Sequence, residues 1–131
     1  MDKIFLVLLF SIFLSELYNI IECNCAKNFT VYLSIQSDPS NENDDGGQAY
    51  TVSAGTTVIE LLKMYHTVDT EMHDGWGLYV KAIDGVSALW DVDLKVWHFY
   101  LNSEPRGSYY SEIYQLKPDD IIIWRIAQYD R

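Results

Sequence analysis

Two aromatic-rich segments constrain the fold of this 131-residue chain more than any other feature. Residues 76–85 read WGLYVKAIDG, and residues 96–101 read VWHFYL. Bulky residues at nearly every position are typical of β-strands, and the Asp-Gly pair that ends the first segment is a strong turn signal. Because both faces of such strands must be covered, we predict that the two segments are central strands of one small sheet.

Three further segments have the patterns of strands. Residues 29–36 alternate, with Val31, Leu33 and Ile35 on one face, which predicts a half-buried strand. Residues 48–53 predict a second strand, and the apolar run 121–126 (IIIWRI) predicts a strand covered on both faces. The acidic stretch 36–47 lacks the spacing of an EF-hand, so a solvated hairpin loop is favoured over a calcium loop.

One amphipathic helix is predicted over residues 57–66. Thr57 and Glu60 have the spacing of a capping box, and the apolar residues Val58, Leu61 and Leu62 follow on one helical face. We expect a polar loop over 66–74 and a short edge strand over 108–114. The predicted architecture is α+β: a small mixed sheet of about five or six strands with one packed helix, β-grasp-like.

The N-terminal residues have the layout of a secretory signal peptide. Lys3 precedes an apolar run over 4–14 that is much shorter than the roughly 20 residues of a membrane-spanning helix. Cys23 and Cys25 fit a cleavage site before Ala26, although an uncleaved membrane anchor is the alternative. We therefore predict a signal peptide over 1–25 and a secreted, extracellular domain over 26–131 that is free of cysteine and of disulfides.

Charge and modification signals agree with an extracellular protein. The sequon Asn28-Phe29-Thr30 marks Asn28 as a glycosylation site. A net charge of −10 argues against nucleic acid and against anionic membranes as partners, and it favours cationic partners or a neutral ligand.

Residue types that could support catalysis or metal binding do not form a recognised motif. His66, Asp69, Glu71, His73 and Asp74 lie close in sequence, but without the spacing of a metal site, so we predict none. No Ser, Cys or Lys nucleophile sits in a catalytic motif, and we predict that the protein is not an enzyme.

The order of four segments resembles a known family. The segments are TVIELL at 57–62, GLYVKAIDGV at 77–86, WHFYLN at 97–102 and LKPDDIIIW at 116–124. Together they resemble the C-terminal domain of transcobalamin, intrinsic factor and haptocorrin. In those carriers, this small domain closes over one side of the corrinoid and a helical barrel holds the other.

The resemblance implies ligand-binding residues and a ligand. Carried over by position, Val80, Ala82 and Trp97 would contact the ligand, with cobalamin as the candidate and another protein domain covering its second side. The sequence departs from the family in three ways. It contains no segment that could form the helical barrel, Asp119 stands where the family usually has glycine, and His98 stands where the carriers often have Gln.

Aromatic residues leave two interpretations open. Trp97 and Trp124 lie on predicted strands, where core packing competes with a role in ligand contact. Trp76 and Trp90 lie near predicted turns, and if exposed they would mark a binding surface. The favoured function is a secreted binding module for a corrinoid or another small ligand; the alternative is an extracellular protein-interaction domain that has lost its ligand.

Overall fold

The computed structural model describes residues 27–37 and 47–128. Its elements are β1 (Asn28–Gln36), β2 (Gln48–Ser53), α2 (Val58–Tyr65), β3 (Val68–His73), β4 (Gly77–Ile83), β5 (Val86–Ser87), α3 (Trp90–Asp93), β6 (Lys95–Leu101), β7 (Glu104–Arg106), the 3-10 helix η1 (Ser108–Glu112) and β8 (Ile121–Gln128). The predicted signal peptide with its two cysteines and most of the acidic loop lie outside the described residues. No helix among the described residues is long and apolar enough to cross a membrane.

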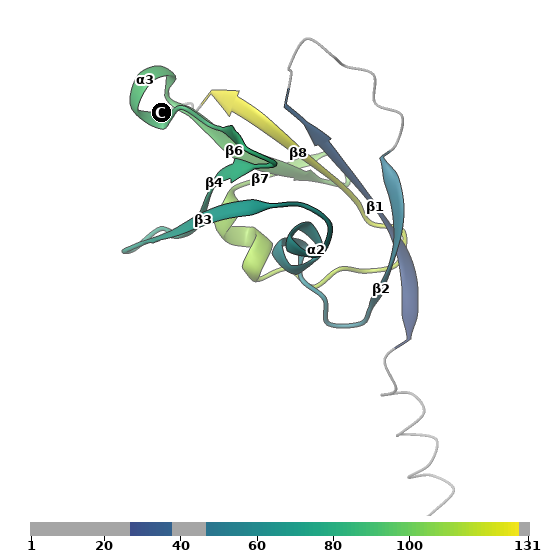
Figure 1. Ribbon diagram of the computed structural model, residues 1–131. Helices are drawn as coiled ribbons and strands as arrows, with labels where there is room; N and C mark the ends of the chain where they lie inside the picture. The colour runs from purple at the N-terminus through teal and green to yellow at the C-terminus, as the bar shows by residue number, and fades with distance from the viewer. Residues whose placement is uncertain (1–26, 38–46, 129–131) are drawn as a thin grey trace, which may run out of the picture.

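The larger sheet has five strands in the order β2-β1-β8-β6-β7 (Figure 1). β8 lies at its centre, parallel to β1 and antiparallel to β6, so the prediction of a central strand over 121–126 is confirmed. The last strand returns beside the first, and α2 contributes to the core that covers one face. The predicted α+β class is therefore confirmed.

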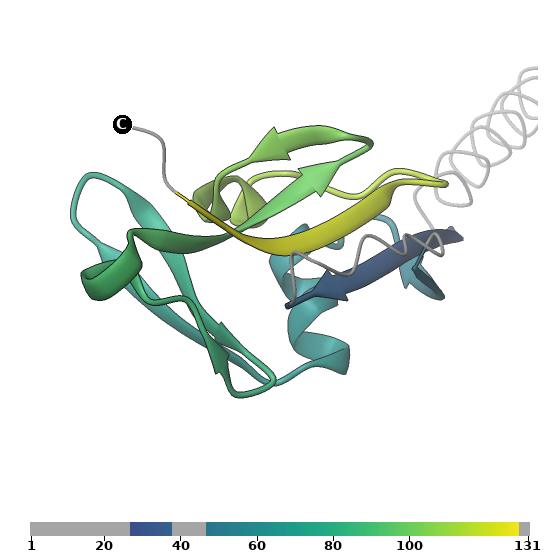
Figure 2. The same cartoon turned by 90° about the horizontal axis from the view of Figure 1, so that it is seen from above.

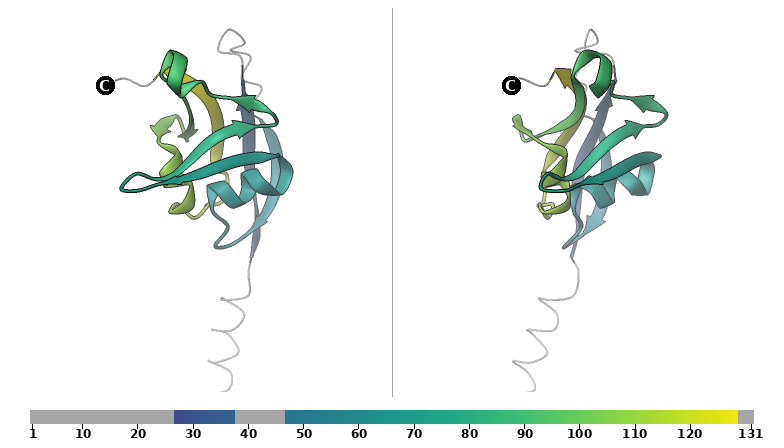
Figure 3. Two further views of the ribbon diagram at one scale, coloured as in Figure 1. Left: turned by 60° about the vertical axis from the view of Figure 1, so that its left-hand side comes forward. Right: turned by 90° about the vertical axis from the view of Figure 1, so that its left-hand side faces the viewer.

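The smaller sheet contains three strands in the order β3-β4-β5. It lies on the same side of the larger sheet as α2 (Figure 2), and its strands cross those of the larger sheet at a steep angle (Figure 3). The two aromatic-rich segments, which form β4 and β6, thus belong to different sheets rather than to one. The two sheets are joined by a side chain: the Trp97 Nε1–H of β6 donates to the carbonyl oxygen of Val86 in β5 at 3.0 Å.

The prediction of a polar loop over residues 66–74 is wrong, because most of this segment forms the strand β3. Its sequence, VDTEMH, pairs with β4 along its whole length. β3 forms an edge of the smaller sheet, and most of its side chains are exposed. An edge strand of this kind needs no alternation of apolar and polar residues, which explains why the hydrophobic pattern does not reveal it.

The helix α2 forms as its sequence predicts. The Thr57 side chain caps its N-terminus by accepting from the Glu60 backbone N–H at 3.4 Å, and Thr57 Oγ1 donates to Glu60 Oε1 at 3.0 Å. Val58, Leu61 and Leu62 are completely buried. The apolar face therefore packs into the core, as the spacing of these residues indicates.

Large aromatic side chains fill the space between the sheets. Trp97, Phe99 and Trp124 are all buried, and the rings of Phe99 and Trp124 lie with their centroids 5.0 Å apart. The core-packing interpretation of Trp97 and Trp124 is confirmed. Aromatic pairs at this separation add to the stabilisation that burial of their area provides.

Residues 108–112 form a 3-10 helix, not the predicted edge strand. Ser108 and Ser111 are both buried, at the three-residue spacing of such a helix. The Ser108 hydroxyl donates to the Trp97 carbonyl oxygen at 2.6 Å, and the Ser111 hydroxyl donates to the Ser108 carbonyl oxygen at 2.5 Å. Both bonds satisfy buried hydroxyls, and the first attaches η1 to β6.

The turn before β8 is organised by the buried carboxylate of Asp120. It accepts hydrogen bonds from Asn102 Nδ2 at 2.9 Å, from the Tyr114 hydroxyl at 2.9 Å and from the Lys117 backbone N–H at 2.8 Å. Burial, together with the hydrogen bond to Asp120, raises the pKa of Tyr114 to about 12. The phenol therefore stays protonated and donates at physiological pH.

Asp119 has a left-handed backbone, with a φ of 66°, a conformation that favours glycine. Aspartate tolerates this conformation better than β-branched residues do. We expect the free energy of unfolding of Asp119→Val to lie about 1–2 kcal/mol below that of Asp119→Gly, the usual cost of this conformation for a residue with a Cβ, whereas Asp119→Gly should not lie below the wild type. Urea unfolding of both variants measures this, and a Val variant as stable as the Gly variant would contradict the assigned turn.

Candidate functional site

A groove of about 790 Å³ opens between the smaller sheet and the β6–β7 hairpin. One wall comes from β3, β4 and the turn between them, and the other from β6, β7 and the start of η1. The lining residues are Glu71, His73, Asp74, Trp76, Gly77, Leu78, Tyr79, Lys81, Val96, Trp97, His98, Pro105, Arg106, Gly107, Ser108 and Tyr109. A volume of this size falls in the range of small-ligand sites.

The floor of the groove is fixed by core packing and hydrogen bonds. Leu78, Trp97 and Ser108 line it and are buried. Trp97 is held on both sides, because its indole donates to Val86 and its carbonyl oxygen accepts from Ser108. A floor held in this way is formed before any ligand arrives, which reduces the entropic cost of binding.

Two exposed aromatic side chains stand at the groove. Trp76 is 67% exposed and Tyr109 is 52% exposed, although both are large and apolar. Trp76 lies between Gly75 and Gly77, both at positive φ, in a turn closed by its own N–H donating to the His73 carbonyl oxygen at 3.1 Å. A Cβ on Gly77 would lie 3.2 Å from the Tyr109 Cβ, so this turn packs directly against η1.

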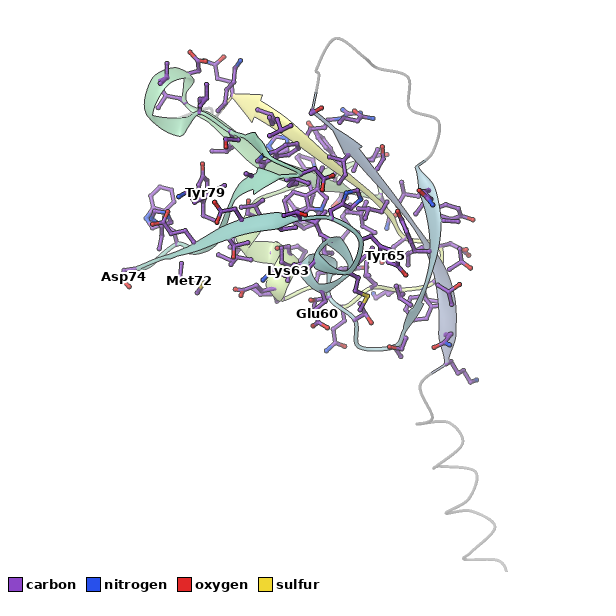
Figure 4. The ribbon with its side chains drawn as sticks, viewed as in Figure 1. Glu60, Lys63, Tyr65, Met72, Asp74 and Tyr79 are labelled. Carbon is purple, nitrogen blue, oxygen red and sulfur yellow. The ribbon has the colours of Figure 1, made fainter. Side chains whose placement is uncertain are left out.

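The antiparallel pair of β3 and β4 (residues 68–83) forms an arm, the β3–β4 arm, which presents different side chains on its two sides. Figure 4 shows Asp74 at the end of the arm, Tyr79 on the side where β6 lies and Met72 on the other side. Tyr79 lines the groove and contacts the ring of His73 edge-on, with centroids 5.5 Å apart. Met72 is 65% exposed and does not line it.

The basic side chains of the groove lie near carboxylates. Glu71 Oε2 lies 3.9 Å from Lys81 Nζ and 3.6 Å from His73 Nε2. The Arg106 guanidinium pairs with Glu104 at 2.9 Å and lies over the Tyr110 ring. With its charges balanced internally, the groove suits an uncharged or weakly charged flat molecule better than a strong anion.

The three ligand-contact residues that the resemblance implied are not brought together at the groove. Trp97 lines its floor, whereas Val80 and Ala82 do not line it. Val80 is fully buried in the core, and Ala82 is half-buried. The roles of Val80 and Ala82 in ligand contact stay predictions, which the groove does not support.

A β-bulge separates Val80 from Ala82 on β4. Asp69 pairs with Ala82 and Thr70 with Val80, which leaves Lys81 as the extra residue of a β-bulge. A bulge shifts the alternation of side chains by one residue. Val80 and Ile83 therefore both face the core.

The histidines of the segment 66–74 are separated in the fold. His66 Nδ1 lies 2.7 Å from Asp84 Oδ2, and this hydrogen bond lowers the pKa of Asp84. His73 lies near Glu71 on the arm. Within the part of the chain that the structure describes, no three His, Cys, Asp or Glu side chains come together as a metal site.

His98 lies on β6 beside Arg125 of β8. Burial, together with the nearby positive charge of Arg125, lowers the pKa of His98 below its ordinary value. Its ring contacts Tyr100 edge-on, and its buried Nε2 has no hydrogen-bond partner among the described residues. Its side chain alternates with that of Trp97 along β6, and His98 is also among the residues that line the groove.

Two remaining predicted positions have simple placements. Asn28 is exposed at the first position of β1, where a glycan would be accessible. Trp90 belongs to α3, and its side chain lies outside the described part of the structure. Trp76 is exposed, which meets the condition under which it would mark a binding surface. Tyr109 and Arg106 were missed, because η1 and β7 have no motif that points to a site.

The fold is shared with solved structures, although no family model and no curated protein matches the sequence. Haptocorrin in complex with Cbi is similar over 80% of this chain and 26% of its own, at 18% identity and a TM-score of 0.56. A candidate metal-binding protein from Ruminococcus gnavus ATCC 29149 is similar over 79% of this chain and 99% of its own, at 15% identity and a TM-score of 0.51. The chain thus spans about a quarter of haptocorrin. These likenesses show a distant relationship of fold.

Proposed function

We propose that this protein is a secreted, non-enzymatic binding module that takes a flat small ligand, with a corrinoid such as cobalamin as the first candidate. The observation that carries the proposal is the groove, in which exposed Trp76 and Tyr109 border a buried, hydrogen-bonded floor. Large aromatic side chains that are exposed beside a buried floor are typical of binding surfaces. The fold shared with haptocorrin supports the choice of ligand.

The expected affinity is modest. This domain covers one side of a flat ligand, so much of the ligand surface stays in contact with water. We expect a dissociation constant in the micromolar range or weaker, because association must still offset the loss of translational and rotational freedom. A second protein domain on the open side of the ligand would strengthen binding.

Calorimetric titration with cobalamin tests this function. Trp76→Ala should weaken binding about tenfold, as expected for the loss of one aromatic anchor. The matched control is Met72→Ala, which removes a side chain of similar exposure from the same arm but outside the groove. It should bind like the wild type.

Two outcomes would contradict the proposal in different ways. A folded Trp76→Ala variant with unchanged affinity would keep the ligand but move the site elsewhere. No detectable heat with millimolar cobalamin would exclude a corrinoid as the ligand. In that case the favoured function becomes an extracellular protein-interaction domain, a role supported by the exposure of Trp76, Tyr109 and Ile113.

A further inference from the structure

The edge strands of the two sheets differ in how they are protected from pairing with other chains. In the described ranges, β7 is three residues long and contains Pro105, and β5 has only two residues. β3 carries Asp69 and Glu71 and lies at a β-bulge. Short length, proline, charge and bulges are the devices by which proteins prevent edge-to-edge association.

The remaining edge strand, β2, has none of these devices. Its sequence, QAYTVS, is six residues long and contains no charge and no proline, and its pairing with β1 is regular. Gln48, Ala49, Thr51 and Ser53 are exposed. A neutral, regular edge of this length is a template for another strand.

The alternation of hydrogen-bonded pairs between β1 and β2 shows which backbone groups of β2 point away from β1. The Ala54 N–H donates to the Lys27 carbonyl oxygen at 3.3 Å, one step beyond the Asn28–Ser53 pair. Because hydrogen-bonded pairs alternate along an antiparallel ladder, Val52, Tyr50 and Gln48 direct their backbone groups toward β1. Ala49, Thr51 and Ser53 therefore direct theirs outward.

The surface beside this edge is also able to pair with a copy of itself. Tyr50 of β2 and Tyr65 of α2 stack with ring centroids 4.1 Å apart, and Tyr65 is still 50% exposed. An aromatic pair next to a neutral, regular strand presents no charge, so this edge fits the identical uncharged edge of a second copy better than a strongly charged partner.

We propose that two copies of this chain associate through β2, antiparallel and with the two-fold axis near Thr51, so that the two five-stranded sheets become continuous. Thr51 would pair with Thr51 of the second copy, and Ala49 with Ser53 of the second copy, through the backbone groups that point outward. The Tyr50–Tyr65 pairs of the two copies then meet on one face of the joined sheet. A six-residue strand buries little area by itself, so the dimer is weak and concentration-dependent.

Sedimentation velocity on protein produced from the full 131-residue sequence tests the proposal. The buffer should contain about 0.15 M salt, because charges are then screened over about 8 Å, which limits the repulsion between two negatively charged copies. The wild type should shift from monomer to dimer as its concentration rises through the micromolar range. Thr51→Lys should raise the dissociation constant at least about tenfold, because it places like charges face to face at the axis. Ala49→Lys, on the same edge, should act in the same direction.

The matched control is Ser87→Lys, which makes the same charge change at an exposed position on the edge strand β5. It should dimerise like the wild type. Circular dichroism of each variant verifies folding. A wild type that stays monomeric at every concentration would overturn the proposal, as would a folded Thr51→Lys that dimerises as well as Ser87→Lys.

Discussion

Replacing Trp97 with alanine should lower the free energy of unfolding by about 3–5 kcal/mol, the range for truncating a buried tryptophan. Its side chain is 1% exposed, and it both lines the groove and joins the two sheets through the hydrogen bond to Val86. The loss should appear as a lower midpoint of urea unfolding followed by circular dichroism.

The control for this variant is Trp76→Ala, since Trp76 is 67% exposed. It should change stability by no more than about 0.5 kcal/mol, as is usual at surface positions. Equal losses in the two variants would contradict the assignment of Trp97 to the core and Trp76 to the surface. The contrast also explains why Trp76 is the better residue for testing ligand binding.

Leu61→Ala should lower the free energy of unfolding by about 2–5 kcal/mol, the usual range for removing most of a buried leucine. Leu61 is completely buried on the face of α2 that packs into the core, and Leu62 beside it should behave alike. The exposed Lys63 supplies the control, because Lys63→Ala removes a side chain from the other face of the same helix. A loss below about 0.5 kcal/mol for Leu61→Ala would show that the buried face is wrongly assigned.

Elements whose patterns depend on burial could be predicted from the sequence. The helix α2 follows from Thr57 and Glu60 at its start and from apolar residues at helical spacing. The central strand β8 follows from its apolar run. In both cases the residues that specify the local structure also build the core, so local and tertiary signals agree.

The parts that could not be predicted depend on pairing partners or on irregular backbone. β3 is polar because it lies at an edge, so only its hydrogen bonds to β4 identify it as a strand. The bulge at Lys81 reverses the alternation after Val80, and no residue there signals it. The groove brings together Trp76 and Tyr109, which are far apart in sequence, and the sequence pointed only to the tryptophan.

The most direct test of the proposed site is to map ligand-induced changes in backbone amide resonances by NMR during a titration with cobalamin. The amides of Gly77, Arg106 and Tyr109 should shift and saturate together, because they line the groove. The amide of Thr51, on the far edge of the larger sheet, should not follow the same curve. Shifts confined to residues outside the groove, or none at millimolar cobalamin, would contradict the groove as the binding site.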